Sequence, residues 1–199
     1  MKFGVTIPNN WGVEDPQEVL EFGPLAESLG YDSVWVMDHL FNTGYIRERL
    51  EDKPYYHPMS TLSYLAATTS KVTLGTSVLV LPYHNPVELA KYAATLDQIS
   101  GGRVILGVGV GAMTEEFDAL GISMRQPGSL TDESFDIIKH LLSNHFPKLL
   151  SQCCDISHPY FSPKPYQFCI PFLVRRFSPA SFHSTVPLSV VSHPFPPPP

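Results

Sequence analysis

The chain has 199 residues, of which 43% are hydrophobic, so it is long enough to bury a sizeable core. Its net charge of -6 argues against nucleic acid or an anionic membrane as the main partner and favours a small-molecule substrate. No apolar run approaches the ~18 residues that a membrane span needs, and the first residues lack the pattern of a secretory signal. We therefore expect a cytoplasmic protein without a membrane partner.

Apolar runs alternate with amphipathic stretches along the first part of the chain. Strands are predicted at residues 2–7, 33–37, 72–81 and 104–108. Helices are predicted at residues 16–29, 58–69, 86–99 and 115–120, and a longer helix is expected to start at Thr131 with Asp132 and Glu133 in its first turn. The nearly continuous apolar strands indicate burial on both faces, as in a parallel sheet with helices outside.

Two helical faces can be predicted from spacing. In the first helix, Leu20, Leu25 and Leu29 lie on one face, which we expect to be buried. In the helix at 86–99, Ile99 is expected to extend the apolar face.

Four βα units make half of an eight-unit barrel, which typically needs ~250 residues. The predicted fold class is therefore α/β, a partial TIM barrel of four to five βα units.

The composition changes near residue 146. All 13 glycines lie at or before Gly128, whereas 12 of the 20 prolines lie at or after Pro147. Proline removes backbone donors, so helices and central strands are not expected after this point, and the last residues are expected to be an irregular, disordered tail. The short sheet would have unpaired edges, which invite self-association, so a homo-oligomer is expected. The cysteines, Cys153, Cys154 and Cys169, show no metal-ligand spacing, and no metal site is predicted.

Residues capable of chemistry follow two of the strands. Asp38 and His39 end the second strand, and Gly107, Gly109 and Gly111 end the fourth. In parallel α/β folds, ligands bind beyond the carboxyl ends of the strands, so these residues form a candidate site. An imidazole can donate or accept a proton near neutral pH. The alternative is that the Asp-His pair only caps a helix or holds a loop.

The third strand and the glycine run each allow a second interpretation. Ser77 stands in an apolar strand, where a buried hydroxyl needs either a ligand or a backbone partner. Gly107 and Gly109, followed by Ala112, fit a dinucleotide-binding fingerprint, but the acidic residue that such a fold needs at the end of a second strand is missing. The glycines could also relieve crowding at a turn from strand to helix.

The order and spacing of several blocks resemble the bacterial-luciferase-like oxidoreductases, most of all their deazaflavin-dependent branch. The blocks cover residues 3–8, 31–39, 74–79, 85–97 and 101–111. The resemblance extends over about residues 1–145, with a weaker echo up to 174 that leads into the family's fifth strand and ends at Arg175. It divides the chain into a half barrel at 1–146, a degenerate lead into a fifth strand at 147–174 and a Pro-rich tail at 175–199.

The resemblance also implies a function and a site. It implies hydride transfer between an 8-hydroxy-5-deazaflavin coenzyme and a small organic substrate; the alternatives are an FMN-dependent monooxygenase and a truncated, non-catalytic fragment. It places His39, with Asp38, beside the cofactor ring as an acid or base, and a non-proline cis peptide at Ser77–Val78 behind the ring. The implied cofactor-binding residues are Thr76, Ser77, Val78, Gly107, Gly109 and Gly111. Glu116 is expected to be an ordinary first-turn helix residue, and Trp35 to pack in the core.

Overall fold

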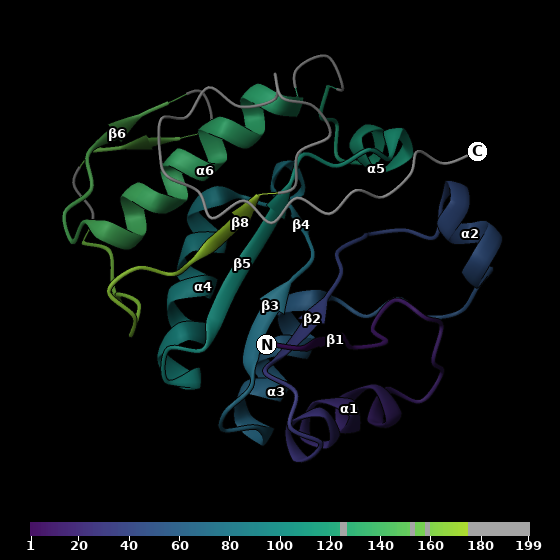
Figure 1. Cartoon of the computed structure of the whole chain (residues 1–199). Helices are drawn as coiled ribbons and strands as arrows, with labels where there is room; N and C mark the ends of the chain where they lie inside the picture. Colours follow the sequence, from purple (N-terminus) through teal and green to yellow (C-terminus); the bar gives the residue numbers. More distant parts are fainter. Residues whose placement is uncertain (124–126, 152–153, 158–159, 175–199) are drawn as a thin grey trace.

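A parallel sheet organises the molecule, and a computed structural model describes it for residues 1–123, 127–151, 154–157 and 160–174 (Figure 1). Neighbouring strands pair in the order β1, β2, β3, β5, β8, and β4 pairs with the far end of β5. Their bounds are β1 Gly4–Thr6, β2 Ser33–Val36, β3 Thr73–Thr76, β4 Leu79–Val80, β5 Val104–Gly109 and β8 Phe172–Val174. Six parallel strands among the described residues, of which β3 and β4 follow one another along β5, confirm the prediction of a partial barrel with four to five βα units.

Helices cover one face of this sheet. They are α1 Pro16–Ser28, α3 Pro58–Thr68, α4 Pro86–Ser100 and α6 Pro127–Ser143, and Figure 1 shows them following the sheet along one side. Local signals in the sequence fix several ends: the Asn85 side chain accepts hydrogen bonds from the first amides of α4, and Gly101 closes α4 in the left-handed conformation. No helix of the described residues is long and apolar enough to cross a membrane.

Shorter elements lie at the end toward which the strands run. They are α2 Gly44–Leu50, the 3-10 helix η1 Leu81–Tyr83 and α5 Thr114–Ala119 (Figure 1). Helix α2 was not predicted from the sequence. A separate hairpin, β6 Leu149–Leu150 with β7 Asp155–Ile156, precedes β8. Strand β8 pairs in parallel with β5 and lies where the resemblance placed a lead into a fifth strand. Among the described residues β8 pairs with no other strand, so it does not contradict the expectation that no helix or central strand follows residue 146.

The two faces of the sheet differ in burial. Val34, Val36 and Leu74 are buried toward the helices, whereas Ser33 and Trp35, the alternate residues of β2, face a cavity. The prediction that both faces are buried is therefore wrong for the described part of the chain. In a closed barrel the inner face would be filled by side chains from all the strands, and the strands of the described residues supply only part of that filling.

The two predicted helical faces need correction. In α1 the buried face is Val19, Gly23 and Ala26, and the predicted Leu25 and Leu29 are exposed. The reason is close packing: a Cβ on Gly23 would lie 2.4 Å from the side chain of Leu65, so small residues face α3. Ile99 of α4 is likewise exposed.

The remaining corrections concern where elements begin and end. The strand expected at 72–81 is two strands, because the chain departs from the sheet between Thr76 and Leu79. Helix α6 starts at Pro127 and not at Thr131, whose hydroxyl donates to the Pro127 carbonyl within the first turn. Asp132 therefore lies beyond the first turn. The predicted tail at 175–199 lies outside the described residues.

Candidate functional site

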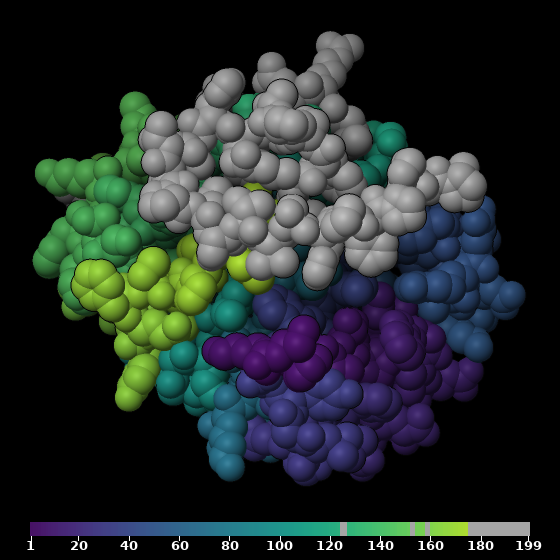
Figure 2. Space-filling model, in the orientation of Figure 1, coloured from purple at the N-terminus to yellow at the C-terminus, as the bar shows by residue number. Residues whose placement is uncertain are grey.

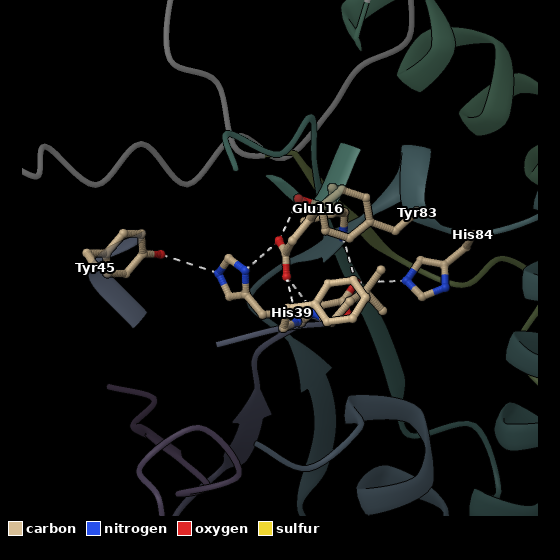
Figure 3. Close-up of polar contacts among 9 residues, drawn as sticks. His39, Tyr45, Tyr83, His84 and Glu116 are labelled. Carbon is tan, nitrogen blue, oxygen red and sulfur yellow. Dashed lines mark hydrogen bonds and ion pairs between the residues drawn. The ribbon is translucent and has the colours of Figure 1, made fainter. Parts of the chain in front are cut away.

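His39 lies in the loop that follows β2 and faces a carboxylate from a distant part of the chain. Its Nδ1 is 2.9 Å from Oε2 of Glu116, which belongs to the first turn of α5 (Figure 3). The other ring nitrogen, Nε2, is 3.3 Å from the hydroxyl of Tyr45, on α2. The side chain of His39 is 18% exposed and that of Glu116 is 0% exposed, so the pair connects a partly accessible imidazole to a buried anchor.

Glu116 accepts four hydrogen bonds on its two carboxylate oxygens. Oε1 accepts from the backbone amides of Leu40 and Phe41, at 2.6 and 3.0 Å. Oε2 lies against His39 and accepts from the hydroxyl of Tyr83, at 2.7 Å. One side chain thus holds both the imidazole and the loop that carries it.

These contacts determine the charge of the carboxylate. Burial acts to raise the pKa of Glu116, but the hydrogen bonds from His39, Tyr83 and the two loop amides outweigh burial and lower the pKa below its usual value. Burial and the bond to Glu116 raise the pKa of Tyr83, so the phenol keeps its proton and remains a donor. At neutral pH Glu116 is therefore ionised and surrounded by donors. The prediction that Glu116 is an ordinary first-turn residue is wrong.

Asp38 forms a second carboxylate–imidazole pair beside the first. Its Oδ2 is 2.7 Å from Nε2 of His84 and accepts a hydrogen bond from the amide of Val80, at 3.0 Å (Figure 3). The pair ties the loop after β2 to β4 and η1, which supports the alternative that Asp38 holds a loop. Its second oxygen, Oδ1, is buried without a hydrogen-bond partner among the described residues, as is the hydroxyl of Tyr55, whose ring lies 5.7 Å from that of His39.

The segment between β3 and β4 has the backbone form that the resemblance implied. The peptide bond between Ser77 and Val78 is cis, which confirms that prediction. The amide of Ser77 donates to the carbonyl of Val36 in β2, and the hydroxyl of Thr76 donates to the carbonyl of Gly107 in β5. The exposed side chain of Ser77 makes no hydrogen bond to any described residue.

The glycine run packs against this segment. A Cβ on Gly107 would lie 1.9 Å from the carbonyl oxygen of Thr76, and one on Gly109 would lie 2.7 Å from the side chain of Val78. One on Gly111 would lie 2.6 Å from the side chain of Val80. Every second residue from Gly107 to Gly111 therefore packs against every second residue from Thr76 to Val80, in the neighbouring segment of the same chain. This favours the interpretation that they relieve crowding, and a contact with cofactor stays a prediction.

A cavity of about 880 Å³ occupies the open inner face of the sheet. It reaches from Phe3 and Asp32, at the amino ends of the strands, to Thr76, Ser77 and Val78 at the carboxyl ends. Figure 2 shows this side of the molecule, on which the purple N-terminal residues lie near the yellow-green segment that ends in β8. In a barrel of this kind the interior is packed and ligands bind at the carboxyl ends of the strands, so the part of the cavity beside Thr76, Ser77 and Val78 is the part that could hold a cofactor.

The structure brings together only some of the predicted site residues. Four of the six residues implied to bind cofactor line the cavity, namely Thr76, Ser77, Val78 and Gly107. Trp35 also lines the cavity, so the prediction that it packs in the core describes only part of its surroundings. The side chains of Asp38 and His39 lie in the adjoining loop layer, outside that wall. The predicted roles of the eight site residues remain predictions.

Comparison with known proteins shows to which family the chain belongs. The model of the luciferase-like monooxygenase family matches residues 1–183. The chain belongs to this family. The match extends beyond the region of clear resemblance, past Arg175 and into residues outside the described structure.

Two relatives in sequence are a reductase and a monooxygenase. The chain is 37% identical over 126 residues to a 5,10-methylenetetrahydromethanopterin reductase from Methanolobus tindarius, covering 63% of this chain and 34% of that protein. It is 34% identical over 128 residues to a 4-hydroxyprotoasukamycin monooxygenase from Streptomyces nodosus subsp. asukaensis, covering 64% and 32%. The chain thus spans about a third of each relative.

Solved structures give the same partial coverage. The chain is similar to monooxygenase RslO1 from Streptomyces bottropensis, with a TM-score of 0.76 and 26% identity over 87% of this chain and 53% of that one. An F420-dependent secondary alcohol dehydrogenase in complex with an F420-acetone adduct shares the fold, with a TM-score of 0.71, 23% identity and coverage of 87% and 52%. The fold is therefore about half of a luciferase-like barrel, and the family includes F420- and FMN-dependent members.

Proposed function

We propose that this chain supplies part of an active site in which hydride passes between a deazaflavin coenzyme and a small organic substrate. The observation that carries the proposal is that His39 and the Ser77–Val78 segment stand at the same carboxyl edge. Asp38, which directly precedes His39, accepts a hydrogen bond from Val80, two residues beyond the cis peptide. A partly exposed imidazole and the wall of a cavity are thus fixed to one another.

The residues present fit a flat heterocycle. The wall that Ser77, Val78 and Gly107 form has short side chains or none, and Trp35 adds an aromatic surface to the cavity. A deazaflavin bound there supplies the hydride chemistry. The chain supplies orientation through the backbone of the wall, and His39 can hold or release a proton at Nε2 on the substrate side. Asp38 Oδ1 and the Tyr55 hydroxyl, both buried and unpaired among the described residues, offer further polar contacts for a substrate.

A second candidate function is that of an FMN-dependent monooxygenase. The relative named 4-hydroxyprotoasukamycin monooxygenase and the similarity to RslO1 favour it. We place the deazaflavin enzyme first because a relative from Mycobacterium tuberculosis, 31% identical over 147 residues, is named a putative coenzyme F420-dependent oxidoreductase, and because a solved structure of this fold holds an F420 adduct.

A titration of the purified chain with F420 and, separately, with FMN tests the proposal. We expect micromolar binding of F420, followed by its absorbance, and at least a tenfold loss of affinity in Ser77→Tyr, which places a ring on the cavity wall. The matched control is Ser60→Tyr, because Ser60 is an exposed residue of α3 on the helical side. Binding of FMN alone would select the monooxygenase. Binding of neither cofactor, by a folded chain, would overturn the proposal.

A further inference from the structure

We propose that Glu116 is a positioning residue that fixes the proton of neutral His39 on Nδ1 and thereby leaves Nε2 free to accept a proton. Its value for catalysis rests on the proposed function, whereas the tautomer itself follows from contacts within the chain. The two carboxylate oxygens of Glu116 provide no proton. Any hydrogen bond between Oε2 and Nδ1 therefore requires the imidazole to be the donor.

The carboxylate cannot turn away from His39. Oε1 accepts from the amides of Leu40 and Phe41, and a backbone amide can only donate. Oε2 is held by the hydroxyl of Tyr83 as well as by the imidazole. Glu116 is fully buried, so no solvent competes for these positions. The fixed end of the carboxylate thus determines which oxygen faces the ring, as Figure 3 shows.

The opposite nitrogen then has a defined role. With the proton on Nδ1, Nε2 carries a lone pair that points toward the hydroxyl of Tyr45, 3.3 Å away. Tyr45 is itself exposed, on the short helix α2. Nε2 is therefore the nitrogen that can take a proton from a group approaching from outside, while Nδ1 remains bound to the carboxylate.

Replacing Glu116 with glutamine makes a specific prediction because glutamine carries one oxygen and one NH₂ group. The oxygen must face the amides of Leu40 and Phe41, since these cannot accept a hydrogen bond. The NH₂ group then faces Nδ1 of His39 and the hydroxyl of Tyr83, both of which can accept. The proton of neutral His39 should move to Nε2, where it can donate to Tyr45. An isosteric substitution 77 positions away in the sequence would thus move the proton of His39 from one ring nitrogen to the other.

Nitrogen-15 NMR of the full chain measures this directly. The signal of His39 is identified among the eight histidines by its loss in His39→Asn, and the spectra are read at a pH at which the ring is neutral. We expect a protonated Nδ1 and an unprotonated Nε2 in the native chain, and the reverse in Glu116→Gln. The control is Glu115→Gln, which changes the exposed neighbouring carboxylate and should leave the native pattern.

Each outcome decides the question. A native chain whose neutral His39 carries its proton on Nε2 overturns the inference, and this needs no variant to fold. Retention of the native pattern in folded Glu116→Gln overturns it as well. Tyr83→Phe provides a second variant, because it keeps the carboxylate and should keep the proton on Nδ1; a reversal there would contradict the inference. These measurements need no cofactor, so a failure of the proposed function would leave their result unchanged.

Discussion

The contact between Gly107 and Thr76 allows a quantitative prediction for Gly107→Ala. The new Cβ would lie 1.9 Å from the Thr76 carbonyl oxygen, and the atoms must separate by about 1.5 Å to reach the 3.4 Å of ordinary contact. Both partners are backbone, so no side chain can rotate out of the way. Overpacking of this kind costs about 1–3 kcal/mol, and losing the hydrogen bond from the Thr76 hydroxyl to Gly107 adds about 1 kcal/mol.

We therefore expect Gly107→Ala to lower the free energy of unfolding by about 2–4 kcal/mol. Urea denaturation followed by circular dichroism measures the loss, which corresponds to a fall in midpoint of roughly 1–2 M. The matched control is Gly128→Ala in α6, where a Cβ meets nothing within 4 Å and the helix should gain about 0.5 kcal/mol. A midpoint for Gly107→Ala equal to that of the native chain would refute the argument that backbone contact fixes this glycine.

Three further predictions follow from contacts elsewhere in the chain. Glu27 accepts hydrogen bonds from the backbone amides of Ser70, Lys71 and Val72. Burial acts to raise the pKa of Glu27, but these bonds outweigh burial and lower the pKa to about 2. The stabilisation that ionised Glu27 gives the fold is therefore complete above the unfolded pKa of 4.5 and is lost as pH falls toward 2. Since Glu27 is partly exposed, we expect only about 1–2 kcal/mol, measured as a fall in urea midpoint between pH 6 and 3 that Glu27→Gln abolishes. Arg103→Lys should cost about 2–3 kcal/mol in the same assay, because one ammonium cannot replace the guanidinium that bonds to four carbonyls and a hydroxyl, and an unchanged midpoint would contradict this. In a full-length relative that retains the histidine corresponding to His39, its replacement by alanine should depress turnover far more than thermal stability, and normal turnover would remove the proposed role.

Local signals in the sequence were enough to predict much of the fold. The apolar run at residues 104–108 and the helix expected at 86–99 each depend on neighbours a few positions away, and each was confirmed. The prediction of the buried face of α1 was wrong because that face is determined by Leu65 of another helix, α3, against which only a residue as small as Gly23 can pack. Choosing the buried side of a helix thus required knowledge of its partner.

The candidate site shows the same limit more clearly. His39 was chosen because it ends a buried strand, which is a local property. Glu116 was missed because a glutamate in the first turn of a helix is common, and nothing near it in the sequence indicates that a histidine 77 positions earlier supplies its partner. The one available signal was the position of α5 directly after the glycine run, at the same edge of the sheet.

Trp35 and Trp11 are the two tryptophans of the chain, and their different surroundings give the protein an intrinsic optical probe. Trp35 packs over Gly75 on the wall of the cavity, whereas Trp11 is 61% exposed in a loop. A yellow heterocycle entering the cavity would accept excitation energy from Trp35, so emission from that indole should be quenched. A Trp11→Phe variant would isolate this signal and report occupancy without any label.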